Sequence, residues 1–314
     1  MSALGAAAGV LVDQLAGEPP TWCHPVAGYG TAMARMERRT YRDRRWAGAL
    51  HLLAGVGTAV AAGRLLDRLL GRTGATLAAV AVASSGRMLD TEALAVAGHV
   101  RRGELELARD RVRSLVGRDP SQLDASELCR AAVESVAENL VDAVIGPLWW
   151  GAVAGPAGAL GHRAVNTSDA MIGHLDDRYR RFGWAAARAD DVVNYLPARA
   201  AVAAVCAVRP HRATRILAAV RQDAPAHPSP NGGVIEAAFA AALGIRLGGT
   251  NRYGDRLEQR GILGVGPPPG PGDVERAVRL RRQASAAAAL TAVVMSAVAG
   301  RRRRRRSLRA HATG

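Results

Sequence analysis

The chain has 314 residues and a formal net charge of +15, from 42 basic and 27 acidic residues, and it contains no lysine. All of the basic residues are therefore arginine, which excludes a P-loop lysine, a Schiff-base lysine and a lysine that carries a biotin or lipoyl group. Apolar residues make up 49% of the chain but aromatic residues only 4%, so alanine, valine, leucine and glycine must supply the buried surface.

The three cysteines, Cys23, Cys129 and Cys206, are too widely spaced for a zinc motif, and their number is odd. A disulfide framework and a structural zinc site are both unexpected, and a compartment facing the reducing cytosol suits the chain best.

Apolar stretches with little or no charge recur along the chain. Three of them approach the roughly 20 residues that a membrane-spanning helix needs, whereas Gly74–Gly86 and Ala200–Val208 are shorter. A turn at 71–74 joins the first two as a hairpin, and Pro147 with the pair Gly155-Pro156 interrupts the third. We therefore expect a polytopic all-α membrane protein with short Ala-rich spans and one broken or re-entrant helix. The alternative is that these are the buried helices of a soluble all-α protein. The stretches are Trp46–Gly63, Gly74–Gly86, Ala143–Gly161, Ala200–Val208 and Gln283–Gly300.

The arginines of the C-terminal end directly follow the last apolar stretch. Arg301–Arg306 and Arg309 carry +7 without an acidic residue, which is typical of a cytoplasmic anchor beside a membrane-spanning helix. A nucleic-acid-binding tail is the rival interpretation, but it leaves the apolar stretches unexplained, so no nucleic acid is expected as a partner. We predict one membrane domain over 1–300, an arginine-rich tail over 301–314, and a cell-membrane location with the site and the C-terminus facing the cytoplasm.

Acidic residues gather where the polar segments meet the apolar stretches. The segment Asp124-Ala-Ser-Glu127 resembles the capped start of a helix, and that helix carries Glu134, Glu138 and Asp142 at intervals of four. Like charges on one stripe need a cation nearby, such as arginine or Mg²⁺, unless the stripe is simply a solvated helix face. Residues 189–194 repeat the arrangement of 137–142, with acids or amides at i, i+1 and i+4. The predicted magnesium ligands are Glu138, Asn139, Asp142, Asp190, Asp191 and Asn194.

Two further polar groups accompany these carboxylates. One comprises Arg163, Asn166 and Asp169, and the other is the loop 221–236, where three prolines and two glycines fix His227 and Asn231 in place. A plain linker is the alternative for this loop, whereas 266–272 does have the composition of a linker. Glu236 is expected to begin an Ala-rich helix, whose N-terminus would favour anions.

The order of several short motifs resembles the CobD/CbiB family of adenosylcobinamide-phosphate synthases. The match begins with Asp13, Gly17-Glu18-Pro19 and His24-Pro25, continues through Arg130–Asn139 and Arg163–Thr167, and reaches the loop of His227. It covers roughly residues 10–255 in the order of the family. Further matching positions include Asp142, Asp169, Arg188, Asp190, Asp191, Asn194, Arg199, Arg221, Asn231, Glu236, Gly249 and Tyr253.

The resemblance implies an ATP- and Mg²⁺-dependent membrane enzyme that joins aminopropanol, usually as its O-phosphate, to a propionate carboxylate of adenosylcobyric acid. It further implies contact with membrane lipid and allows a homo-oligomer or a complex with other corrin-pathway enzymes. His227 or Asp169 is expected to act as the base for the incoming amine. The groups expected to bind substrate or phosphate are Arg163, Asn166, Arg188, Arg199, Asn231, Glu236 and His24.

Two other functions remain open from the residues alone. The acids and amide of Asp190-Asp191-Val-Val-Asn194 approach the acidic signature of Mg²⁺-dependent membrane prenyltransferases, although few aromatic residues are present to line an isoprenoid slot. The third possibility is a membrane scaffold without catalytic activity in a corrin-assembly complex.

Overall fold

The computed structural model describes residues 2–18, 22, 24–117, 119–253 and 256–312, and it describes their side chains except for 251–253, 256–260 and 299–312. Cys23 lies outside the described residues, as do the side chains of the arginine-rich tail. The helical elements are α1 (Ser2–Ala16), α2 (Pro25–Thr40), α3 (Arg45–Ala83), α4 (Gly86–Arg101), α5 (Leu105–Val112), α6 (Ala125–Leu140), the π-helix η2 (Val141–Ile145), α7 (Gly146–Ala154), α8 (Pro156–Ile172), α9 (Tyr179–Phe182), α10 (Trp184–Val193), α11 (Tyr195–Val208), the 3₁₀ turn η3 (Pro210–Arg212), α12 (Ala213–Asp223), the 3₁₀ turn η4 (Ala224–Ala226), α13 (Gly232–Leu243) and α14 (Pro271–Ala312). The strands are β1 (Leu247–Tyr253) and β2 (Arg256–Leu263).

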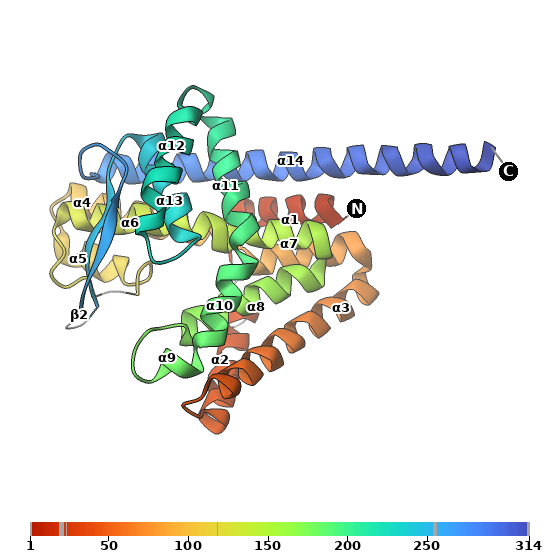
Figure 1. Cartoon of the computed structure of the whole chain (residues 1–314), viewed down its shortest axis with the longest axis horizontal. Coiled ribbons are helices and arrows are strands. Elements are labelled where there is room, and N and C mark those ends of the chain that lie inside the picture. The colour runs from red at the N-terminus through yellow and green to blue at the C-terminus, as the bar shows by residue number, and fades with distance from the viewer. Residues whose placement is uncertain (1, 19–21, 23, 118, 254–255, 313–314) are drawn as a thin grey trace.

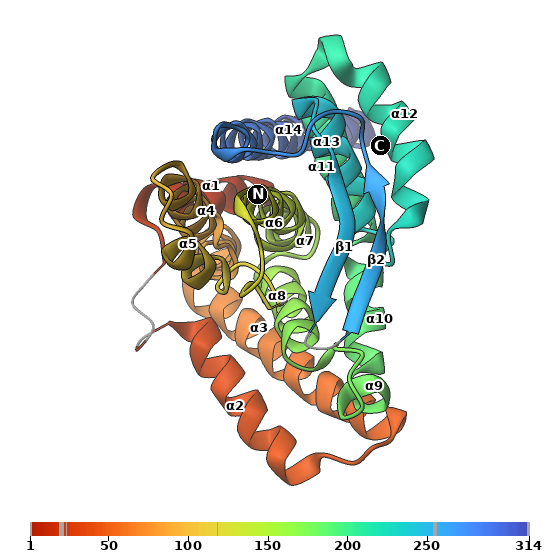
Figure 2. The same cartoon turned by 90° about the vertical axis from the view of Figure 1, so that its left-hand side faces the viewer.

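The helices form an elongated layered bundle. Figure 1 shows α14 running across the upper part of the molecule, with α1 and α7 beneath it and α8 and α3 below them, while the C-terminal end of α14 projects beyond the other helices. Seen from the end in Figure 2, the β1–β2 hairpin stands beside α12 and α13, and α2 packs on the outer side of α3. The all-α prediction is confirmed for the bulk of the chain.

Small residues account for the close packing that the composition demands. A Cβ atom added to Gly5 would lie 2.4 Å from the carbonyl oxygen of Thr73, and one added to Gly9 would lie 2.7 Å from that of Leu77. The same holds between α3 and α8, where a Cβ on Gly63 would lie 2.5 Å from the Cα of Ala157. Glycine and alanine therefore let these helices approach backbone to backbone, so the core needs few aromatic side chains.

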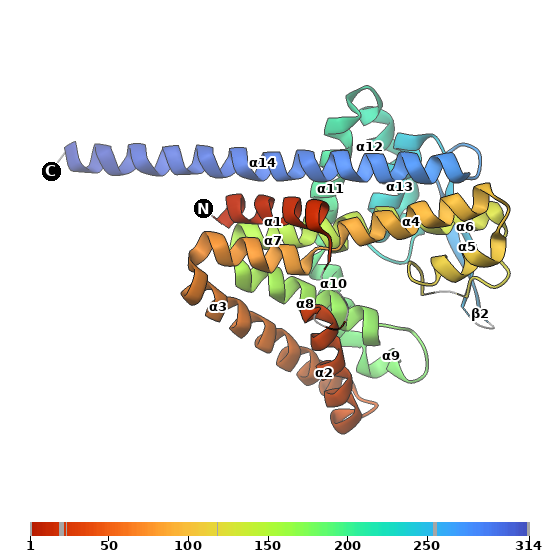
Figure 3. The same ribbon diagram turned by 180° about the vertical axis from the view of Figure 1, so that it is seen from behind.

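The third apolar stretch is broken, as its proline and glycine residues predict. Gly155 has φ +70°, a conformation that favours glycine, and the chain reverses there between α7 and α8. The predicted hairpin of the first two stretches is also present, because Gly71 interrupts α3 with φ +67°. Figure 3 shows the two parts of α3 folding back on each other on the rear face.

The β1–β2 hairpin is absent from the sequence-based prediction. Its strands pair antiparallel from Leu247 with Leu263 to Tyr253 with Arg256, with an irregularity between Gly248 and Gly249. Arg130 and Glu134 of α6 attach β1 to the bundle, since Arg130 donates to the carbonyls of Gly248 and Thr250, and Glu134 accepts from the Gly248 amide at 2.9 Å. The hairpin is therefore held by groups far away in sequence, which a local pattern does not reveal.

By length and composition, one helical stretch of the described residues, Arg45–Arg101, is suited to crossing a membrane. A second is obtained if α10 and α11, which meet at an angle of 42°, count as one bent span. Only 28% of the apolar window in Arg45–Arg101 is buried within the protein. Most of that window consequently faces outward.

Candidate functional site

Carboxylates from three parts of the chain lie close enough to interact with one another. Asp142 lies in η2, Asp169 near the end of α8, and Asp190 and Asp191 on α10. Asp142 interacts electrostatically with Asp190, Asp169 and Glu138, and Asp169 interacts with both Asp190 and Asp191. We call Asp142, Asp169, Asp190 and Asp191 the acidic cluster. A π-helical turn at Asp142 is consistent with a functional position, because such turns are frequent at functional sites.

Burial and like charge both perturb this cluster. Burial is the largest cause that raises the pKa of Asp142 well above its ordinary value, and Asp190, Glu138 and Asp169 raise it further, while Arg163 opposes them. Burial, followed by Asp190 and Asp191, raises the pKa of Asp169 to about 7. The cluster thus holds more negative charge than its surroundings stabilise, and it favours a bound cation or bound protons.

A chain of buried hydrogen bonds fixes the orientation of Asp190. The Asn194 side-chain amide donates to both oxygens of the Asp190 carboxylate, at 3.0 and 3.1 Å, and Asn166 donates to one of them at 3.4 Å. Asn194 is fully buried at the junction of α10 and α11, and its Oδ1 lies 2.8 Å from His162 Nε2. Because Asn194 Oδ1 can only accept a hydrogen bond, His162 Nε2 must carry the proton. His162, Asn194 and Asp190 therefore form one ordered relay of hydrogen bonds.

The loop of His227 is tied to the acidic cluster through Asn231. The Asn231 amide donates to the backbone carbonyl of Asp191 at 2.8 Å, and its Oδ1 accepts from Arg199 Nη1 at 2.8 Å. Arg199 also donates to the Pro230 carbonyl and stacks on the ring of Tyr195, with its Cζ 3.7 Å from the ring centroid. The structure therefore brings the loop 221–236 next to the predicted ligands Asp190 and Asp191.

A second polar group adjoins the acidic cluster. Glu138 of α6, His227 of the loop and Glu236 of α13 each offer a donor atom, and these atoms all lie within 4.8 Å of one another. His227 Nε2 is 3.4 Å from Glu236 Oε1, and the two side chains are 2% and 1% exposed. Glu138, a predicted magnesium ligand, thus lies beside His227 and Glu236 and also interacts with Asp142 of the acidic cluster.

Arg163 is the cation whose charge opposes the raised pKa of Asp142. It is largely buried, interacts electrostatically with Glu18, Asp142 and Asp13, and its Nε makes no hydrogen bond to a described residue. His24 caps α2 by accepting from the Val26 amide at 3.1 Å, and its Nε2 lies 3.3 Å from Glu18 Oε2. Arg163, which was predicted to bind phosphate, consequently lies beside the acidic cluster. His24 contacts Glu18, which in turn interacts with Arg163.

Several predicted residues have other positions. Asn139 donates to the carbonyl and hydroxyl oxygens of Ser135 within α6, and the exposed Arg188 pairs with Asp191 at 3.4 Å. Glu134 leaves the predicted stripe for the hairpin, as described above. The expectation that Glu236 begins a helix is wrong, because α13 begins at Gly232 and Glu236 lies in its second turn beside His227.

The structure also adds residues that sequence reasoning missed. His162 is not among the predicted site residues, yet it orients Asn194 and through it Asp190. Glu18, which belongs to a matching motif, interacts electrostatically with Arg163. The signal that could have identified His162 is its position four residues before Asn166 on the same helix, which also contacts Asp190.

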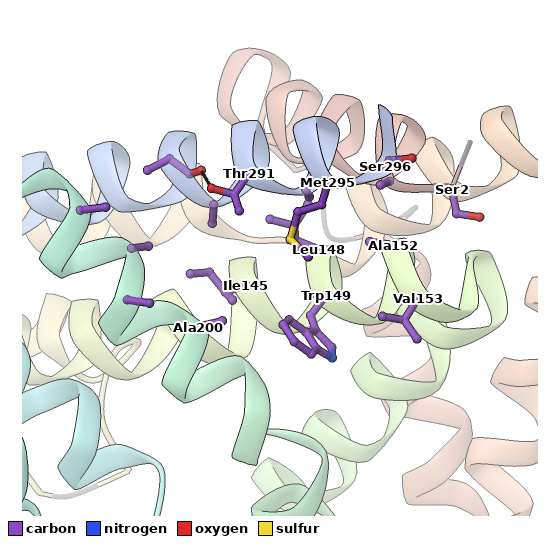
Figure 4. A pocket seen from close by; sticks show the side chains of 17 residues that line it. Ser2, Ile145, Leu148, Trp149, Ala152, Val153, Ala200, Thr291, Met295 and Ser296 are labelled. Atoms are coloured by element: carbon purple, nitrogen blue, oxygen red, sulfur yellow. Dashed lines mark hydrogen bonds between the residues drawn. The ribbon is translucent and has the colours of Figure 1, made fainter. Parts of the chain in front are cut away.

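An apolar groove lies apart from these polar groups. It has a volume of about 780 Å³ and runs between α1, α7, α11 and α14, with alanine along most of its wall. Figure 4 shows Trp149, Met295 and Leu148 around it. Its lining offers few polar groups, so it is unsuited to carboxylate or phosphate chemistry.

Comparisons with known proteins show the family to which this helical protein with its acidic cluster belongs. The family model described as CobD/Cbib protein matches residues 6–281. The chain is 47% identical over 289 residues to the cobalamin biosynthesis protein CobD of Mycobacterium tuberculosis, covering 89% of this chain and 91% of that protein. It is 44% identical over 271 residues to CobD of Rhodobacter capsulatus, with coverages of 83% and 85%, and 41% identical over 290 residues to CobD of Chromobacterium violaceum, with coverages of 89% and 92%. No solved structure matches the chain.

The chain belongs to the CobD/CbiB family, and the resemblance drawn from its motifs is confirmed. Its homologues make it a protein of cobalamin biosynthesis.

Proposed function

We propose that the protein is an adenosylcobinamide-phosphate synthase, which uses ATP to join aminopropanol O-phosphate to a propionate carboxylate of adenosylcobyric acid. The observation that carries the proposal is the convergence of Asp142, Asp169 and Asp190 from three helical segments beside the buried Arg163. Membership of a cobalamin-biosynthesis family supports the choice of substrates.

The donor set of the acidic cluster fits Mg²⁺. Mg²⁺ prefers oxygen ligands and usually binds one or two carboxylates together with substrate phosphates. Asp142 and Asp190 supply the carboxylates, and Asn194 and Asn166 hold Asp190 in a fixed orientation. When bound, Mg²⁺ with ATP would supply charge neutralisation on the transferring phosphoryl group.

The reaction that we propose has two balanced steps. A carboxylate oxygen of the corrinoid attacks the γ-phosphorus of ATP, and ADP leaves as the acyl phosphate forms. The neutral amine then attacks the acyl carbon, phosphate leaves, and the amine loses one proton. Because the chain contains no lysine, Arg163 is the proposed partner of the phosphoryl oxygens at this cluster.

Asp169 is the group that we propose as acceptor of the amine proton. Its pKa of about 7 matches proton transfer near neutral pH better than that of an ordinary aspartate. His227, the other candidate, is engaged by Glu236 and by the backbone of Ser229. Asp169 shares the cluster with Asp190, whereas His227 faces the second polar group.

We further propose that the protein is embedded in the cell membrane, with the acidic cluster and the C-terminus on the cytoplasmic side. The largely outward-facing apolar window within Arg45–Arg101 and the reversal at Gly155 support this. The reversal returns α8 to the side from which α7 departs, so Asp142 and Asp169 lie at the same end of the α7–α8 pair (Figure 1). Such a hairpin keeps both polar segments on one face of the bilayer.

Reconstitution of the purified protein in detergent with ATP, Mg²⁺ and both substrates tests the proposal. We expect amide product from the wild type, and a loss of at least about 100-fold in Asp190→Asn, since electrostatic groups of this kind typically contribute that much. Asp177→Asn, which alters an exposed aspartate, is the matched control and should keep its activity. A wild type that binds the substrates but forms no product would instead indicate the scaffold function.

A further inference from the structure

We propose that Glu138, His227 and Glu236 form a binding site for a divalent transition metal of the zinc, cobalt or manganese class, separate from the proposed Mg²⁺ position. The three side chains come from α6, the loop after η4, and α13. Their donor atoms all lie within 4.8 Å of one another. This inference does not depend on the proposed reaction.

One of the three pairs of ligand atoms has the spacing that a small ion requires. Ligand atoms on a tetrahedral ion at roughly 2.0–2.2 Å from the metal are about 3.3–3.6 Å apart. The His227 Nε2 to Glu236 Oε1 distance of 3.4 Å falls within that range. Three protein ligands would leave a fourth position open for water or a substrate atom, as in catalytic zinc sites.

Space for an ion is maintained by glycine. A Cβ atom added to Gly232 would lie 3.0 Å from His227 Cε1 and 3.1 Å from Glu138 Oε1. Any other residue at this position would therefore press on two of the three ligands. The next residue, Gly233, is equally constrained, because its Cβ would lie 2.4 Å from the Cβ of His227.

The backbone of Ser229 fixes the orientation of the His227 imidazole. The Ser229 amide donates to His227 Nδ1 at 3.1 Å, and the Ser229 carbonyl lies 3.3 Å from the same nitrogen. In this arrangement Nδ1 accepts, and Nε2 carries the proton beside Glu236. An ion on Nε2 would require the proton to move to Nδ1, where the Ser229 carbonyl can accept it, as backbone carbonyls do for metal-binding histidines.

The ligand types separate this site from the acidic cluster. An imidazole with two carboxylates suits zinc, cobalt or manganese, whereas Mg²⁺ favours oxygen ligands alone. A divalent ion would also neutralise the two negative charges of the ionised carboxylates, which are costly to bury together. Glu236 is 1% exposed, so the ion would be held inside the protein and not at its surface.

Cobalt titration of the full-length protein in detergent tests the inference, after chelator treatment and in the presence of excess Mg²⁺. We expect one Co²⁺ per chain with visible d–d absorption, and displacement by Zn²⁺ but not by Mg²⁺. Removing a direct ligand in His227→Gln or Glu236→Gln should weaken binding more than the roughly 10–100-fold cost of losing an outer-shell partner. His174→Gln, which alters an exposed histidine, should bind Co²⁺ like the wild type.

Zinc K-edge absorption of the wild-type protein gives a measurement that does not depend on the folding of variants. The site predicts one imidazole in the first shell together with oxygen ligands. A spectrum without imidazole scattering, absence of stoichiometric Co²⁺ binding, or an unchanged Co²⁺ spectrum in folded His227→Gln would each overturn the proposal. In those cases His227 and Glu236 form a hydrogen-bonded pair without an ion.

Discussion

The side-chain amide nitrogen of Asn194 donates to both oxygens of the Asp190 carboxylate, at 3.0 and 3.1 Å, across the junction between α10 and α11. The contact matters because Asn194 Oδ1 is bonded in turn to His162. The two helices meet at 42°, and Asn194 at their junction orients Asp190, which interacts with Asp142.

Asn194→Ala should destabilise the fold as well as the site. The substitution removes the partner of the buried His162 and one of the two amide donors to Asp190, and each unsatisfied buried group costs about 1–3 kcal/mol. Thermal unfolding in detergent measures the loss. Asn139→Ala is the control, because Asn139 donates to Ser135 within its own helix and its removal should cost less. Equal losses in the two variants would contradict the relay.

The pKa of Asp169 predicts how stability depends on pH in the absence of divalent cations. Because its pKa is raised in the folded protein to about 7, the folded state binds the proton more tightly than the unfolded state. The stability that this proton supplies is complete below about pH 4 and is lost as the pH rises through 7. Each unit of pKa difference corresponds to about 1.4 kcal/mol.

Asp169→Asn should flatten that dependence, which denaturant unfolding at a series of pH values between 4 and 8 would measure. Asp177→Asn is the matched control at an exposed position and should keep the wild-type slope. A slope that is the same in all three proteins would mean that Asp169 does not carry the perturbed proton.

Mg²⁺ should stabilise the protein through the acidic cluster. A ligand present at 100 times its dissociation constant raises the free energy of unfolding by about 2.7 kcal/mol. Asp142→Asn and Asp190→Asn should abolish most of the rise in melting temperature that Mg²⁺ causes. Asp43→Asn, on the exposed surface near Arg181, should retain it. A Mg²⁺ effect of wild-type size in Asp142→Asn would contradict the ligand assignment.

Gly155→Ala should weaken the reversal between α7 and α8. Its φ of +70° is unfavourable for alanine by roughly 1–2 kcal/mol, and the added Cβ would lie 2.4 Å from the Arg72 guanidinium carbon. Gly57→Ala provides the contrast within α3, where a Cβ meets nothing within 4 Å and the substitution should be neutral or stabilising. Melting temperatures of the two variants test this, and a Gly155→Ala protein as stable as the wild type would exclude strain at the turn.

The parts of the fold that the sequence predicts are those with a local signal. The capping box of Asp124 and Glu127 marks the start of α6, and Gly155-Pro156 marks the reversal, because both act through neighbouring residues. The hairpin was missed because Arg130 and Glu134 hold it across more than 110 residues. The spacing of acids likewise predicts that Asp190 contacts Asn194, whereas the π-helical turn that holds Asp142 has no periodic signal.

The central claim, that ATP activates the corrinoid carboxylate, is tested most directly with adenosylcobyric acid labelled with ¹⁸O in its carboxylates. Purified protein, ATP, Mg²⁺ and aminopropanol O-phosphate would complete the reaction, and mass spectrometry would follow the label. We predict amide product with one ¹⁸O atom transferred to inorganic phosphate for each turnover, and ADP formed in equal amount. Label in AMP, or amide formed without label in phosphate, would contradict the account.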